Sequence, residues 1–137
     1  MKHILCCVDG SENAETALRA AIELSAKLSA DLSLLMVNVT FGRSPRGPQV
    51  LVWTNDEAQV ILDQACDVVA QSGQKPAYAG IAVAREASTG IINHALEHEV
   101  DAIVIGTGDK RGLSRLFLGS VAMDVANRAP CTVIIAR

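Results

Sequence analysis

Residues 104–122, VIGTGDKRGLSRLFLGSVA, combine the residue types that proteins use to hold an anion. Glycines let the backbone approach a ligand closely, and the free N–H groups at the start of a helix attract phosphate. The glycines, the serine and the basic residues of this stretch are Gly106, Gly108, Gly112, Gly119, Ser120, Lys110, Arg111 and Arg115. Asp109 places a carboxylate among them. The spacing alone indicates either a phosphate-binding loop or a flexible loop before a capped helix, with Ser120 as ligand or cap.

The elements that position this stretch can be predicted from the hydrophobic pattern. Five short apolar runs are dense in aliphatic residues, which is typical of strands buried on both faces: 3–8, 32–39, 78–84, 102–106 and 132–136. Between them, apolar residues recur at helical spacing in four segments, 14–28, 58–69, 91–96 and 121–129. Ser88 is a candidate N-cap of the third helix. This alternation predicts a three-layer, doubly wound α/β fold with a parallel sheet, in one domain over residues 1–137.

The predicted topology directs attention to the loops after the first and fourth strands. Ligands of such sheets bind beyond the carboxyl ends of the strands, where the winding direction reverses. Asp9 follows the first strand, and the glycine-rich stretch follows the fourth. If these two strands are neighbours, both loops face one crevice. Residues 41–53, with two prolines and two glycines, are expected to be irregular, either a flap over this crevice or a solvated connection.

Composition limits the classes of function. The chain has 137 residues, half of them hydrophobic, and its net charge of −3 argues against a nucleic-acid surface. No stretch approaches the roughly 20 apolar residues of a membrane span, and the first apolar run is too short for a signal peptide. The four cysteines lack metal or redox spacing and are expected to be small buried hydrophobes. We therefore expect a cytoplasmic protein that binds neither nucleic acid nor membrane.

The segments KHILCCVDGSENAETAL and DAIVIGTGDKRGLSRLFLGSVAMDVANRAPCTVIIAR, with fitting strand and helix spacing between them, resemble the universal stress protein family along essentially the whole chain. The resemblance implies a five-stranded parallel sheet of order 3-2-1-4-5 with four helices. It also implies a homodimer, often formed by pairing of the last strand, here 132–136, and an unprotected apolar edge strand calls for a partner.

Members of this family that bind ATP carry the pattern G-x-x-G-x(9)-G-[ST]. Gly106, Gly119 and Ser120 match three of its four positions, and Asp109 replaces the second glycine. The resemblance further implies that Asp9 approaches the ribose and metal side of the nucleotide. It implies as well that Val39, at the end of the second strand, meets the adenine through its backbone.

The carboxylate of Asp109 opposes phosphate binding, but only to a limited extent. At about 5 Å from one phosphate charge and an effective dielectric constant near 20, the repulsion is roughly 3 kcal/mol. This is similar to the stabilisation of roughly 1.5–3 kcal/mol from one hydrogen bond to a charged group. A bound Mg²⁺ would turn the carboxylate into a ligand, or Lys110 and Arg111 would neutralise it. Alternatively, Gly108 supplies the flexible position and Asp109 faces solvent. This repulsion should weaken the binding of triphosphates most, so we hypothesise that the ligand carries fewer phosphates.

Two functional classes follow from these residues. The first is a regulatory module that binds an adenine nucleotide (ATP, ADP or AMP, with or without Mg²⁺) and reports its occupancy to an unidentified protein partner. The second is a dimeric stress-response interaction protein of the same fold that has lost nucleotide binding. We identify no catalytic residue, so enzymatic activity beyond a slow ATPase is not expected.

Three other polar residues have weaker claims to function. His94 and His98 lie four residues apart on the third predicted helix, a spacing that can bind one metal ion. The apolar stripe there includes Ile91, Ala95 and Leu96, so we expect both histidines on an exposed polar face and no metal site. Asp124 lies within the fourth helix and is expected to be solvated.

Overall fold

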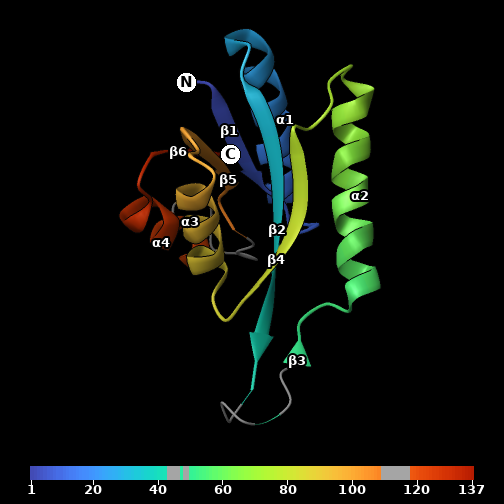
Figure 1. The fold of residues 1–137 in the computed structure, drawn as a ribbon, viewed down its shortest axis with the longest axis vertical. Helices are drawn as coiled ribbons and strands as arrows, with labels where there is room; N and C mark the ends of the chain where they lie inside the picture. Colours follow the sequence, from blue (N-terminus) through green and yellow to red (C-terminus); the bar gives the residue numbers. More distant parts are fainter. Residues whose placement is uncertain (43–46, 48–49, 109–117) are drawn as a thin grey trace.

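The sheet at the centre of the molecule joins strands from the whole length of the chain (Figure 1). The computed structural model describes residues 1–42, 47, 50–108 and 118–137, which form six strands and four helices. In chain order these are β1 (His3–Cys7), α1 (Glu12–Leu28), β2 (Asp31–Phe41), β3 (Val50–Leu51), α2 (Asn55–Gln71), β4 (Tyr78–Ala84), α3 (Ala87–Glu97), β5 (Ala102–Gly106), α4 (Ser120–Arg128) and β6 (Thr132–Ala136).

Five of the strands pair in parallel and follow the predicted topology. β4 pairs with β2, β2 with β1, β1 with β5, and β5 with β6. Numbered in chain order, the five predicted strands therefore lie in the order 3-2-1-4-5, and the α/β fold class is confirmed. β1 and β5 are neighbours, so the loops that follow them lie at the same edge of the sheet.

The sixth strand, β3, corrects the expectation that residues 41–53 are irregular throughout. β2 continues to Phe41, two residues beyond the predicted end, and β3 pairs with it antiparallel, Thr40 opposite Leu51 and Phe41 opposite Val50. The glycines and prolines of this segment indicated an irregular connection, so the short strand within it was not predicted. Val50, Leu51 and Val52 are residues that favour strands, and the protruding end of β2 offers them unpaired backbone groups.

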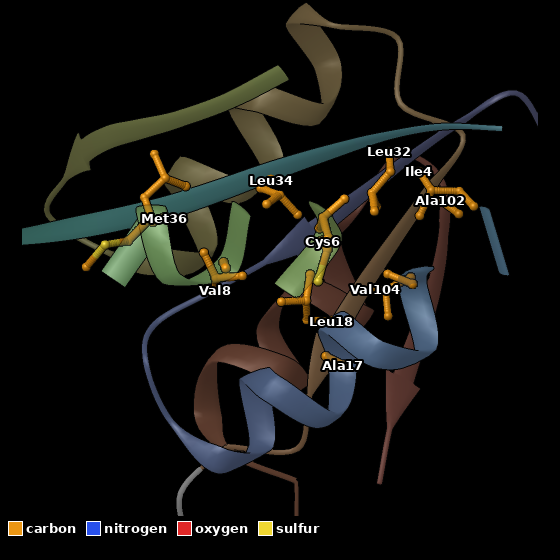
Figure 2. Close-up of a cluster of buried hydrophobic side chains, with 14 of the residues drawn as sticks. Ile4, Cys6, Val8, Ala17, Leu18, Leu32, Leu34, Met36, Ala102 and Val104 are labelled. Carbon is orange, nitrogen blue, oxygen red and sulfur yellow. The ribbon is translucent and has the colours of Figure 1, made fainter. Parts of the chain in front are cut away.

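Helices cover both faces of the sheet. In Figure 1, α1 and α2 lie on one side of the strands and α3 and α4 on the other. Because successive side chains of a strand point to opposite faces, β1 contributes to both cores. Figure 2 shows Ile4, Cys6 and Val8 with Leu18 of α1, in the core beneath α1 and α2. Leu5 and Cys7 belong to the second core, beneath α3 and α4.

The third helix differs from its prediction in both start and buried face. α3 begins at Ala87 after Glu86, so Ser88 lies inside the first turn and is not the N-cap. His94, expected to be exposed, is only 7% exposed, while Leu96, expected to be buried, is 59% exposed. The reason is a contact with another element: the His94 ring packs against Tyr78 of β4, 5.2 Å between ring centroids, and against His98 at 4.0 Å.

Asp124 also has structural partners, contrary to the expectation of a merely solvated side chain. The buried hydroxyl of Ser88 donates a hydrogen bond to the Asp124 carboxylate, and Arg128 forms an ion pair with it at 2.7 Å. The Ser88 hydroxyl and then the Arg128 guanidinium lower the pKa of Asp124. These contacts tie the start of α3 to the middle of α4.

The structure also shows the burial of the four cysteines and the character of the helices. All four cysteines are free; Cys6 and Cys7 are buried, while Cys66 and Cys131 are half-buried. Burial raises the pKa of Cys6 to about 12, so this thiol packs as an uncharged group. In the part of the chain that the structure describes, no helix has the length and apolar character required to cross a bilayer.

Candidate functional site

A cavity of about 300 Å³ lies at the carboxyl ends of β1 and β5. Its walls come from the residues that follow β1, from the first turns of α1, α3 and α4, and from Leu35 and Val37 of β2. α1 and α4 pack on opposite faces of the sheet, so the winding direction reverses between β1 and β5. The cavity therefore occupies the place where doubly wound sheets bind their ligands, and its volume is at the small end of ligand pockets, about 300–1,000 Å³.

Most of the residues predicted for a nucleotide site lie in the lining of this cavity. They are Asp9, Gly106, Gly108, Gly119 and Ser120. Val39 is not in the lining; Val37, two residues earlier on β2, takes that place. Asp109 lies outside the described residues, as do Lys110 and Arg111.

The glycines of the site allow backbone segments to touch. A side chain on Gly106 would collide with the backbone carbonyl of Asn13 in α1. Gly108 has a φ of +88°, and a Cβ there would lie 2.8 Å from the Cα of Gly119. The amide of Gly119 donates to the carbonyl of Thr107 at 2.5 Å. The glycines therefore bring the end of β5, the start of α1 and the start of α4 into contact.

Asn13 fixes this arrangement, and sequence reasoning missed it. Its side-chain Nδ2 donates to the carbonyl of Gly108 at 2.7 Å, so the first turn of α1 holds the backbone that leaves β5. Asn13 and Gly108 are 95 residues apart, and no local pattern connects them. Val37 was also missed, although counting back along the alternating strand from Val39 places both residues on the same face.

Three helices begin at the cavity, and their starts differ in whether a side chain caps them; the N-cap of α3, Glu86, makes no side-chain cap hydrogen bond. In α1, the Ser11 hydroxyl accepts from the amide of Ala14 at 3.1 Å, and the Asp9 carboxylate accepts from the amide of Ser11 at 2.8 Å. In α4, the N-cap is Gly119, and no side chain caps the helix. Ser120 is therefore the first helical residue rather than the cap. The first amides of α4 have no partner within the helix and can receive an anion.

The ionisable side chains of the described lining are Asp9 and Cys7. Among the described lining residues, Asp9 is the charged side chain and none is basic. Burial, and to a lesser extent the neighbouring Cys6 and Asp9, raise the pKa of the Cys7 thiol, so it stays protonated and is a poor nucleophile. No cluster of three or more metal-binding side chains occurs within the described ranges.

Comparisons with known proteins identify the family of the chain. The family model of the universal stress protein family matches residues 1–137. The universal stress protein YxiE of Bacillus subtilis is 32% identical, over 98% of this chain and 97% of its own length. Among solved structures, a universal stress protein from Archaeoglobus fulgidus has a TM-score of 0.79 and 25% identity, covering 100% of this chain and 99% of its own. A structure of the Archaeoglobus fulgidus protein in complex with dAMP has a TM-score of 0.75, also with 25% identity, covering 100% and 98%. The chain belongs to the universal stress protein family.

Proposed function

We propose that this universal stress protein binds an adenine nucleotide in the cavity after β1 and β5 and acts as a regulatory module that responds to its occupancy. The observation that carries the proposal is the uncapped start of α4, which lines the same cavity as Asp9. A phosphate at the α4 amides and sugar hydroxyls at the Asp9 carboxylate would use both polar ends of the site. The complex of the Archaeoglobus fulgidus relative with dAMP supports this assignment.

The polar groups of the site fit a monophosphate better than a triphosphate. The backbone donors are the amides of the first turn of α4, and each hydrogen bond to a charged group contributes roughly 1.5–3 kcal/mol. No basic side chain among the described lining residues offsets further phosphate charge. In the sequence, Asp109 adds a carboxylate to the same loop, beside Lys110 and Arg111. We therefore expect AMP to bind more tightly than ATP in the absence of Mg²⁺.

Calorimetric titration with AMP, ADP and ATP, with and without Mg²⁺, tests the proposal. Two variants of Ser120 identify the donor. Ser120→Ala removes only the hydroxyl, whereas Ser120→Pro also removes the first amide of α4, at a helix position that tolerates proline. The preceding Gly119 has φ −62° and ψ 158°, an extended conformation compatible with a following proline. AMP affinity should fall further in Ser120→Pro than in Ser120→Ala, with little change in thermal stability.

No heat with any nucleotide would contradict the proposal and favour the alternative of an interaction protein without a nucleotide. Nucleotide that copurifies, detected by absorbance near 260 nm after denaturation, gives an independent check.

A homodimer through β6 is part of the same proposal. β6 pairs with β5 on one side, and its Val133, Ile134 and Ile135 keep intermediate exposure in the single chain. A second copy would cover this edge strand and reduce its exposed apolar surface. Sedimentation equilibrium should give twice the mass of one chain, and a monomer at micromolar concentration would contradict the dimer.

A further inference from the structure

β4 forms the edge of the sheet that lies opposite β6. Within residues 1–42, 47, 50–108 and 118–137, β2 is the one strand that pairs with β4. In Figure 1, α2 and α3 lie on opposite sides of β4, so they cover the faces of the sheet. Among the described strands, none therefore pairs with the backbone N–H and C=O groups along the outer edge of β4. This edge is seven residues long, against five for β6.

The sequence of β4 lacks the features that keep other edge strands from pairing with further chains. Such strands commonly carry charged residues, prolines or bulges. β4 reads YAGIAVA, without charge or proline, and its register with β2 runs uninterrupted over residues 78–84. Val83 is 58% exposed, and Ala79 is exposed on the same face of the strand. The apolar residues of β6, by comparison, have intermediate exposure. β4 therefore presents an apolar edge that is open to pairing.

The side chains of β4 are complementary to those of a second, antiparallel copy. When the central Ile81 lies opposite its own copy, every other pair contains at least one small residue: Tyr78 with Ala84, Ala79 with Val83, and Gly80 with Ala82. Directly opposite side chains on one face have Cβ atoms about 4.5–5.5 Å apart. The exposed Val83 would therefore contact Ala79 of the second copy. Any shifted register leaves residues of β4 unpaired, so this alignment is the one that uses the whole strand.

The largest side chain of β4 does not block this edge. A Cβ on Gly80 would overlap the hydroxyl of Tyr78, so the Tyr78 ring lies above Gly80 of its own strand. The ring also packs against His94 and His98, with centroids 5.2 and 5.8 Å away. Tyr78 is therefore held over β4 and toward α3, and the edge is left to the backbone groups.

We propose that β4 is a self-pairing edge, to which β4 of a second copy of this chain binds antiparallel with the two Ile81 residues at the two-fold axis. The pairing joins two sheets into one and covers Val83. It does not depend on nucleotide binding, and it differs from the dimer proposed through β6. A dimer formed through β6 keeps two free β4 edges, so a protein that uses both edges forms assemblies larger than a dimer.

A lysine at the exposed position of β4 tests the pairing. Val83→Lys places an ammonium group where pairing would remove it from water, and lysine on an edge strand opposes association. Val60→Lys is the matched control, because Val60 of α2 is 53% exposed and the change in charge is the same. Sedimentation velocity from micromolar to millimolar concentration compares both variants with the unmodified protein, and circular dichroism confirms that they are folded.

The unmodified protein and Val60→Lys should form assemblies larger than a dimer as the concentration rises, whereas Val83→Lys should stop at the dimer formed through β6. If the unmodified protein is only a dimer, a monomeric Val83→Lys would assign that dimer to β4 and support the inference. Equal assembly of Val83→Lys and Val60→Lys would overturn it, as would an unmodified protein that is a monomer throughout. Val83 does not line the cavity, so AMP titration of Val83→Lys reports on the proposed function separately.

A disulfide tests the register. Opposed residues of antiparallel strands have Cα atoms about 4.5–5.5 Å apart, within the range of about 4.4–6.8 Å that a disulfide spans. Ile81→Cys should therefore give a covalent dimer on oxidation with glutathione disulfide, beyond any formed by the four free cysteines of the unmodified protein. In this register the two copies of residue 83 lie roughly 13 Å apart, so Val83→Cys should not. No added dimer with Ile81→Cys, or as much with Val83→Cys, would overturn the inference.

Discussion

Replacing Gly106 by alanine tests whether the close contact of β5 with α1 builds the site. The new Cβ would overlap the backbone carbonyl of Asn13, and backbone cannot rotate away as a side chain can. Overpacking of this kind costs roughly 1–3 kcal/mol, and we expect the upper end. For 137 residues with an unfolding entropy of about 2.1 cal/mol/K per residue, 3 kcal/mol lowers the Tm by roughly 10 °C.

The same displacement should weaken ligand binding. If the first turn of α1 moves, the hydrogen bond from Asn13 to the Gly108 carbonyl is lost, and with it the position of the backbone after β5. One net hydrogen bond contributes about 0.5–1.5 kcal/mol, so AMP affinity should fall roughly two- to thirteenfold.

Thermal denaturation followed by circular dichroism, together with calorimetric titration, measures both effects. Gly73→Ala is the control, because Gly73 has a φ of +84° but no atom within 4 Å of the added Cβ. It carries the backbone penalty of about 1–2 kcal/mol without a collision, so its Tm should fall less and AMP binding should be unaffected. If Gly106→Ala keeps the original Tm and affinity, the contact with Asn13 is not tight and the reasoning is refuted.

Three further predictions concern residues outside this contact. Burial, and secondarily His98, lower the pKa of His94 below its usual value of about 6.5, with Glu97 opposing. As the pH falls below about 6.5 the unfolded chain takes up this proton first, so stability falls until the pH passes below the folded pKa. Urea unfolding at pH 7.5 and 5.5 should therefore show a smaller acid loss in His94→Gln, and an equal loss would contradict the prediction. Ser88→Ala should cost about 1 kcal/mol, seen as a Tm lower by roughly 3 °C, since the bond between α3 and α4 is lost. Asp109→Gly should raise ATP affinity about tenfold by calorimetry, and unchanged affinity would mean that the carboxylate is neutralised or distant from the phosphates.

The fold was predictable because its signals are local. Each of the five parallel strands is a short aliphatic run between helical segments, and burial on both faces removes polar residues from such runs. The glycine spacing from Gly106 to Ser120 can also be recognised directly in the sequence. These features identified the sheet edge at which the cavity lies.

The details that could not be predicted depend on pairs of distant residues. His94 is buried because the ring of Tyr78, on another element, packs against it, and the pattern of its own helix gives no sign of this contact. Asn38 is a polar residue in an apolar strand, and its role is visible only once Trp53 is known to lie beside it and to accept its hydrogen bond. Periodicity describes one element at a time, so contacts between elements remained hidden.

The contact between Gly108 and Gly119 has a consequence for engineering this protein. The chain leaves β5 and enters α4 at points joined by a hydrogen bond from Gly119 to Thr107, so the intervening segment begins and ends at nearly the same place. The entropy cost of closing a flexible loop grows slowly, about 0.6 kcal/mol for each doubling of its length. Chain added between these two points therefore need not move β5 or α4, and a peptide tag or a reporter domain inserted there should leave the contact between Gly108 and Gly119 intact.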